Sequence, residues 1–197
     1  MRKIAVMLCA IVMTILSVFA TASAGGLEYR LNEIKKDNGA LEKTSNSADL
    51  PLASTKDFVY DFNFYGAFMG NGHELSIENT SDFEKLNHRL LFKTIFNDCE
   101  ILSLWLTEDA KQVLSVSCTW ASSVRNSDKY LEDFLWLLSE AFLASGAEAN
   151  SLSDLYAKIG EANAFNVGSK GEMTIGGVSL SYETTSYSGT SFKMEHK

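Results

Sequence analysis

Histidine and carboxylate side chains are the residues of this sequence that could support acid–base chemistry or metal binding. The histidines His73, His88 and His196 are scattered, and no two have the i, i+4 spacing that places two ligands on one helical face. We therefore interpret them as solvated surface residues and predict no metal site. The alternative that the sequence leaves open combines His88 with Glu84 or Asp82.

The local signatures of common enzyme classes are absent from the sequence. It contains no Gly-x-Ser-x-Gly elbow, no His-Glu-x-x-His, no phosphate loop, no dinucleotide fingerprint and no Asp-x-Asp-x-Asp-Gly calcium loop. Acidic residues crowd positions 74–84, but glycoside hydrolysis needs two carboxylates about 5 to 10 Å apart across a cleft, which spacing alone does not define. These absences favour a protein without catalytic activity or a cofactor.

Aromatic residues are the most suggestive feature. Tyr60, Phe64 and Phe68 recur with helical spacing opposite Phe58 and Phe62, so a helix here would carry rings on two faces. Rings exposed in a row can stack on sugars or anchor a protein partner. Alternatively, both faces are buried between the sheet and another layer. The candidate ligand- or partner-binding residues are Tyr60, Phe64, Phe68 and Trp136.

Two further surfaces could contact a partner. Trp136, Leu137 and Leu143 lie off the main apolar stripe of their predicted helix, so that helix is either buried twice or forms a homodimer or partner contact. The last strands are rich in hydroxyl groups that could bond a glycan or another chain, or could be an ordinary solvated strand face. These hydroxyl-bearing residues are Ser179, Ser181, Thr184, Thr185, Ser186, Tyr187 and Ser188.

Cys99 and Cys118 form a possible disulfide in an oxidising compartment. If Leu102 and Leu104 face Val116 and Leu114 across the turn between their strands, Cys99 lies opposite Thr119 instead. A slip of one residue would bring the two cysteines face to face. The alternative is that each is a small buried apolar residue.

Hydrophobic periodicity and turn residues predict the elements that position these side chains. A helix capped by Ser54 and Asp57 ends at Gly70, and a longer helix runs from Asn126 or Ser127 to Gly146. The remaining predicted elements are strands over 90–96, 100–106 and 112–120, a helix over 151–160 with Ser151 as its cap, a hairpin turning at residues 176–177, and a strand over 190–195. This order predicts an α+β fold with helices packed on one face of an antiparallel sheet of about five to six strands.

The pattern resembles a group of small exported bacterial proteins of unknown function. The features that carry the resemblance are a helix with Phe58-x-x-x-Phe62-Asn63, a three-stranded meander, an apolar helix and a terminal Gly-Gly hairpin. It covers roughly the last 140 residues, counted from Lys56 where the polar leader ends. Its motifs are structural, so the resemblance implies no catalytic residue.

The N-terminus has the features of a secretory signal peptide: two basic residues, an apolar stretch over 4–20 and small residues at 22–24. We predict cleavage after Ala24, and the alternative is an uncleaved anchor. The predicted organisation is a signal peptide over 1–24, a polar leader over 25–55 and one α+β domain over 56–197.

Charge and compartment together limit the partners. Removal of residues 1–24 would change the formal net charge from −8 to −10, which disfavours binding to nucleic acid. No mature segment is long and apolar enough to predict a membrane span. We predict a secreted or periplasmic, non-catalytic binding module for an unknown protein or glycan partner, with a homodimer possible. The alternatives are an extracytoplasmic hydrolase that uses carboxylates or His88, and a structural component of the envelope.

Overall fold

The chain after residue 49 forms one compact unit in the computed structural model. The structure describes residues 50–70, 73–77, 83–86, 88–97, 99–121 and 128–197. The predicted signal peptide and the predicted leader up to residue 49 lie outside these residues. The unit begins at Leu50 rather than at Lys56, because the backbone of Leu52 already donates a hydrogen bond to Val113 at 2.8 Å. Among the described residues, none of the helices has the length and apolar character that a membrane crossing requires.

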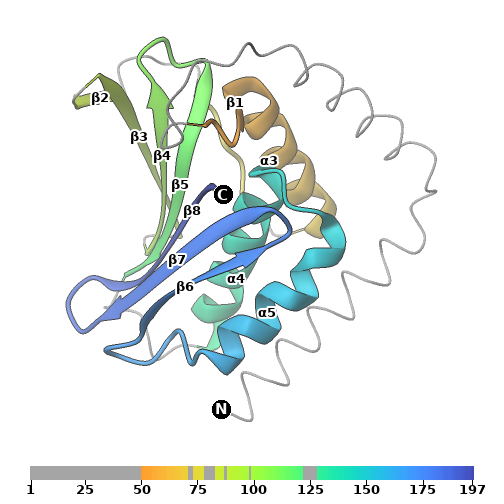
Figure 1. The fold of residues 1–197 in the computed structure, drawn as a ribbon, viewed down its shortest axis with the longest axis vertical. Coiled ribbons are helices and arrows are strands. Elements are labelled where there is room, and N and C mark those ends of the chain that lie inside the picture. Colours follow the sequence, from red (N-terminus) through yellow and green to blue (C-terminus); the bar gives the residue numbers. More distant parts are fainter. Residues whose placement is uncertain (1–49, 71–72, 78–82, 87, 98, 122–127) are drawn as a thin grey trace. The chain divides into compact units, whose positions relative to one another are not determined.

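One antiparallel sheet forms the framework, with its strands in the order β2-β3-β4-β5-β8-β7-β6 and β1 paired to β5 off this path (Figure 1). The final strand β8 therefore lies in the middle, between the meander that ends at β5 and the hairpin β6-β7. The strands are β1 (Ala53–Ser54), β2 (Phe83–Leu86), β3 (Arg89–Phe96), β4 (Glu100–Thr107), β5 (Gln112–Trp120), β6 (Lys170–Ile175), β7 (Val178–Thr185) and β8 (Gly189–His196). The α+β prediction is confirmed, and β1 and β2 are additions to the predicted strands.

Helices cover one face of this sheet, as predicted (Figure 1). Burial alternates along β4, where Leu102, Leu104 and Leu106 are fully buried and the residues between them are partly exposed. A strand that places successive side chains on opposite faces gives this pattern when only one face is covered. Glu100 shares the face of the three leucines, so its carboxylate lies in the core.

The meander has a different register from the predicted one. Leu102 pairs with Cys118 and Leu104 with Val116, a shift of two residues. Val116 stays on the helix-covered face, but Leu114 is only partly buried and Val113 is buried in its place. A register irregularity between Trp105 and Leu106 accompanies this shift. The backbone amide of Ala121 donates to the carbonyl of Cys99 at 2.9 Å. Both cysteines are buried and this pairing holds them at different rungs of the ladder, so the possible disulfide between them is not formed.

The first helix of the described chain, α3 (Thr55–Met69), confirms the predicted helix and its ends. The hydroxyl of Ser54 accepts a hydrogen bond from the backbone amide of Asp57 at 3.1 Å, and Gly70 ends the helix with a left-handed φ of 76°. Phe58 and Phe62 are completely buried and are the residues that attach the helix to the core.

The long helix α4 (Asp128–Ala144) packs against α3 and β5. The predicted capping residues 126 and 127 lie outside the described residues. Leu137 and Leu143 are 0% and 3% exposed, so the prediction that they form a contact surface is wrong. They are buried because α4 is enclosed on more than one side. This is the first of the two alternatives for an apolar helix, burial on two sides instead of contact with a partner.

The shorter helix α5 (Leu152–Glu161) buries Leu155 and Ile159, as predicted. Ser151 precedes it within a 3-10 turn, η3 (Ala149–Ser151), and makes no side-chain capping bond, which corrects the predicted cap. The glycine turn at 176–177 joins β6 and β7 as expected, because both glycines have positive φ values, 56° and 84°.

Candidate functional site

Helix α3 exposes an aromatic row that faces away from its buried side. Tyr60 and Phe64 are 51% and 44% exposed, and Phe68 is partly exposed. The ring centroids of Tyr60 and Phe64 are 6.5 Å apart with the planes 10° from parallel, and those of Phe64 and Phe68 are 6.0 Å apart at 17°. We call these three residues the aromatic stripe. The alternative that both faces of this helix are buried is therefore wrong.

Beyond its first turn, α3 carries a single charged side chain, that of the partly exposed Asp61. Lys56 and Asp57 are exposed at the start of the helix, and the exposed residues that follow are Tyr60, Phe64 and Ala67. The partly covered Tyr65 lies beside the stripe, where burial and the charge of Asp61 raise its pKa to about 12, so its phenol stays neutral. A surface of exposed rings with a single charged side chain suits an apolar or aromatic partner.

Trp136 does not join the aromatic stripe. It lies on α4, where it is partly exposed, whereas the stacked contacts of the stripe run along α3 from Tyr60 to Phe64 and from Phe64 to Phe68. Of the four residues predicted to bind a partner, three therefore form a continuous row on α3 and the fourth lies on another helix.

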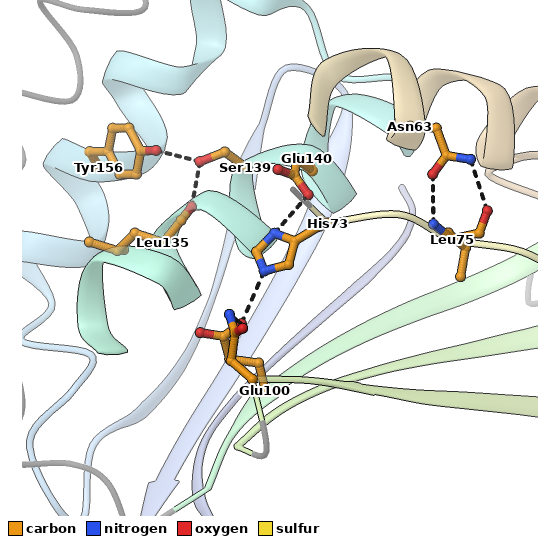
Figure 2. Close-up of polar contacts among 9 residues, drawn as sticks. Asn63, His73, Leu75, Glu100, Leu135, Ser139, Glu140 and Tyr156 are labelled. Atoms are coloured by element: carbon orange, nitrogen blue, oxygen red, sulfur yellow. Dashed lines mark hydrogen bonds and ion pairs between the residues drawn. The ribbon is translucent and has the colours of Figure 1, made fainter. Parts of the chain in front are cut away.

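The segment that follows α3 returns along the helix and is fastened to it. Asn63 donates a hydrogen bond from Nδ2 to the carbonyl of Leu75 at 2.8 Å and accepts one at Oδ1 from the Leu75 amide at 2.7 Å (Figure 2). Gly66 permits this close approach, because a Cβ atom there would lie 2.6 Å from the carbonyl oxygen of His73. These contacts fix both the return segment and the rotation of α3.

His73 leads the return segment into the core, between two carboxylates from different elements (Figure 2). Its Nδ1 lies 3.1 Å from Oε2 of Glu140 on α4, and its Nε2 lies 3.1 Å from Oε2 of Glu100 at the start of β4. The side chain of His73 is 3% exposed and that of Glu100 is 0% exposed. Asn97 donates a further bond to Oε2 of Glu100 at 3.2 Å. This arrangement corrects the prediction that His73 is a solvated surface histidine.

Electrostatics keep the His73 imidazole protonated. Burial alone lowers its pKa, but the hydrogen bonds and negative charges of Glu100 and Glu140 outweigh burial and raise the pKa to about 9. Cys118 also lies in the field of these carboxylates: burial first, and then the charges of Glu140 and Glu100, raise the pKa of its thiol. The thiol is therefore poorly suited to act as a nucleophile.

The buried triad of His73, Glu100 and Glu140 has the groups of an acid–base site but not its geometry. In a catalytic histidine, a carboxylate orients one ring nitrogen while the other nitrogen faces the substrate. Here carboxylates occupy both nitrogens, and all three residues are at most 5% exposed. In the described part of the chain, no group of three or more His, Cys, Asp or Glu residues is arranged to hold a metal ion. This arrangement joins the segment after α3 to α4 and β4.

The alternative catalytic residue, His88, is on the surface. Its side chain is 89% exposed in the turn between β2 and β3, and its Nδ1 lies 3.7 Å from Oε2 of Glu108. Glu84 is exposed on β2, and Asp82 lies outside the described residues.

Sequence reasoning missed the buried triad, although one signal pointed to it. Glu100 occupies the same alternating face of its strand as Leu102 and Leu104, and Glu140 lies between buried Ser139 and Ala141 in the mostly apolar second half of α4. Two carboxylates on faces that must be buried need a cation, and His73 is the one that the fold supplies.

No protein-family model, no curated protein and no solved structure matches the chain. The resemblance to small exported bacterial proteins therefore stays a prediction.

Proposed function

We propose that this protein is an exported, non-catalytic binding module that contacts a protein partner through the aromatic stripe of α3. The observation that carries this proposal is the exposure of Tyr60 and Phe64, 51% and 44%, on a helix that already buries Phe58 and Phe62. Aromatic side chains that remain half exposed in a parallel row have a large area to bury on binding and little side-chain entropy to lose.

The contacts behind the stripe support this role, because they give it a rigid base. Asn63, Gly66 and His73 fix α3 against the return segment and, through the buried triad, against α4 and β4. A preorganised surface loses less freedom on binding than a mobile one. Engagement of both His73 nitrogens supports a structural rather than a catalytic role for the most perturbed histidine.

Site-specific photo-crosslinking tests the proposal. The photoreactive residue p-benzoylphenylalanine is placed at Tyr60 in the full-length protein and irradiated in the producing cells. We expect a discrete adduct of higher mass, and we expect Phe64→Ala to weaken it severalfold. The matched control is the same residue at Tyr187, which is 92% exposed in the turn between β7 and β8.

The outcomes of the crosslinking experiment discriminate between a homodimer, a complex with another protein and the absence of a partner at α3. An adduct with a second copy identifies the partner as the protein itself, and one with another protein identifies a hetero-complex. Equal labelling from positions 60 and 187, or none from position 60, contradicts the proposal. Turnover of peptides, glycans or esters that is abolished by His88→Gln would favour the hydrolase alternative instead.

A further inference from the structure

The face of the sheet opposite the helices carries a second surface with different chemistry. Strands β6, β7 and β8 pair in register, so that Lys170, Glu183 and Ser191 form one row across them. Glu172, Ser181 and Lys193 form the next row on the same face. The alternate positions Leu180, Phe192 and Met194 are fully buried under the helices, which places both rows on the open face.

These six residues, together with Gly171 and Tyr182 between the rows, line an open hollow of about 790 Å³. The hollow is shallow and open to solvent, so a ligand would lie across the sheet and would not be enclosed. The lining differs from that of a typical site because it has no aliphatic side chain. An apolar ligand would find little to bury there.

The hollow carries charges of both signs, and one of its lysines, Lys193, is already paired with a carboxylate beside the hollow, Glu195. Two lysines and two glutamates surround the half-buried hydroxyls of Ser181 and Ser191. Ser191 shares a hydrogen bond with Thr119 at 3.1 Å, and Lys193 pairs with Glu195 at 2.6 Å. Within the described residues, the side chains of Lys170, Glu172, Ser181 and Glu183 form no hydrogen bond or ion pair. Donors and acceptors are thus both available to a ligand.

We propose that this hollow binds a neutral oligosaccharide. A polyol presents donors and acceptors in equal measure without net charge, which matches a mixed array of hydroxyls, carboxylates and ammonium groups. A polyanion would meet Glu172 and Glu183, and a peptide would find no pocket for an apolar side chain. The proposal rests on β6–β8 alone and is independent of the partner surface on α3.

Titration of the mature protein, followed by ¹H–¹⁵N NMR, tests the site. The probes are the neutral trisaccharides maltotriose, cellotriose and chitotriose, with trigalacturonate and triglycine as comparison ligands. We expect at least one neutral trisaccharide to shift the amide resonances of β6–β8 in a saturable manner. We expect Glu183→Gln to weaken that binding by about tenfold and Ser181→Ala by a few fold, in line with charged and neutral hydrogen bonds.

The matched control is Ser103→Ala, on the open face of β4 outside the hollow, which should leave the affinity unchanged. Phe64→Ala should also leave it unchanged, so the outcome here is separate from that of the α3 proposal. Absence of saturable shifts with all three neutral probes overturns the inference. So does preferential binding of trigalacturonate or triglycine, or an equal loss of affinity in Ser103→Ala.

Discussion

His73 and Glu100 form an ion pair inside the protein, with Nε2 and Oε2 3.1 Å apart and neither side chain more than 3% exposed. The pair connects the segment after α3 to the first residue of β4. Removal of two charges from water is costly, and mutual attraction offsets this cost only when the geometry is good and both partners are present. Replacement of one partner is therefore a sensitive test of what the pair does.

His73→Gln should lower the free energy of unfolding at pH 7 by about 3 to 5 kcal/mol, because it removes the cation and leaves two carboxylates buried together. Urea unfolding followed by tryptophan fluorescence measures the change. The control is His88→Gln, which alters an 89% exposed side chain and should change stability by no more than about 0.5 kcal/mol. Similar effects of the two variants would show that the triad contributes little.

The same ion pair predicts how stability depends on pH. The folded-state pKa of His73, about 9, lies above its ordinary value of 6.5, so the folded protein binds the proton more tightly than the unfolded chain does. The stabilisation is complete below about pH 6.5 and is lost as the pH rises through 9. By linkage, the loss is on the order of 3 kcal/mol. Unfolding of the wild type at pH 6 and pH 9.5 measures it, and His73→Gln should lack this component of the pH dependence.

Local patterns predicted most of the fold, because most of its elements carry their own signals. Ser54 and Gly70 mark the ends of α3, and the glycine pair at 176–177 marks the β6-β7 turn. The position of β8 between β5 and β7 depends on pairing between strands far apart in sequence, which no local pattern contains. The predicted register was displaced by two residues, because the alternation of apolar residues defines which face of a strand is buried but not which residues pair across the ladder.

The candidate site also contains one part that local patterns predict and one part that only the fold brings together. The aromatic stripe follows from helical spacing, so Tyr60, Phe64 and Phe68 could be named in advance, although their exposure could not. The buried triad brings together positions 73, 100 and 140 from three different elements. A histidine beside a glycine turn gives no sign that it enters the core, since its burial depends on the close packing of the return segment against Gly66.

Gly66→Ala should destabilise the protein by about 1 to 3 kcal/mol, since the new Cβ would lie 2.6 Å from the carbonyl oxygen of His73 and would displace the return segment. Gly160→Ala is the matched control. It lies in helix α5, and a Cβ atom there would meet nothing within 4 Å, so alanine should stabilise the helix by roughly 0.5 to 1 kcal/mol. Thermal unfolding of both variants should therefore shift in opposite directions. Shifts in the same direction would contradict the close approach.

Cleavage of the signal peptide should leave a mature chain that begins at Gly25 and carries no lipid. Ala22 and Ala24 are the small residues that a signal peptidase accepts, and they directly follow the apolar stretch. Intact mass spectrometry of protein from the medium or periplasm checks this. A mass that retains residues 1–24 would instead support the uncleaved anchor.

The mature protein should keep Cys99 and Cys118 as thiols that react only after unfolding. Both are buried, Cys118 faces Leu102 across the ladder, and burial together with the charges of Glu140 and Glu100 raises the pKa of its thiol, which disfavours the reactive thiolate. Iodoacetamide should leave the native protein unmodified at pH 7.5 and should add two carbamidomethyl groups in urea. A third group would reveal a retained Cys9. A native mass about 2 Da below that of the reduced chain, with no alkylation in urea, would establish a disulfide and contradict this register.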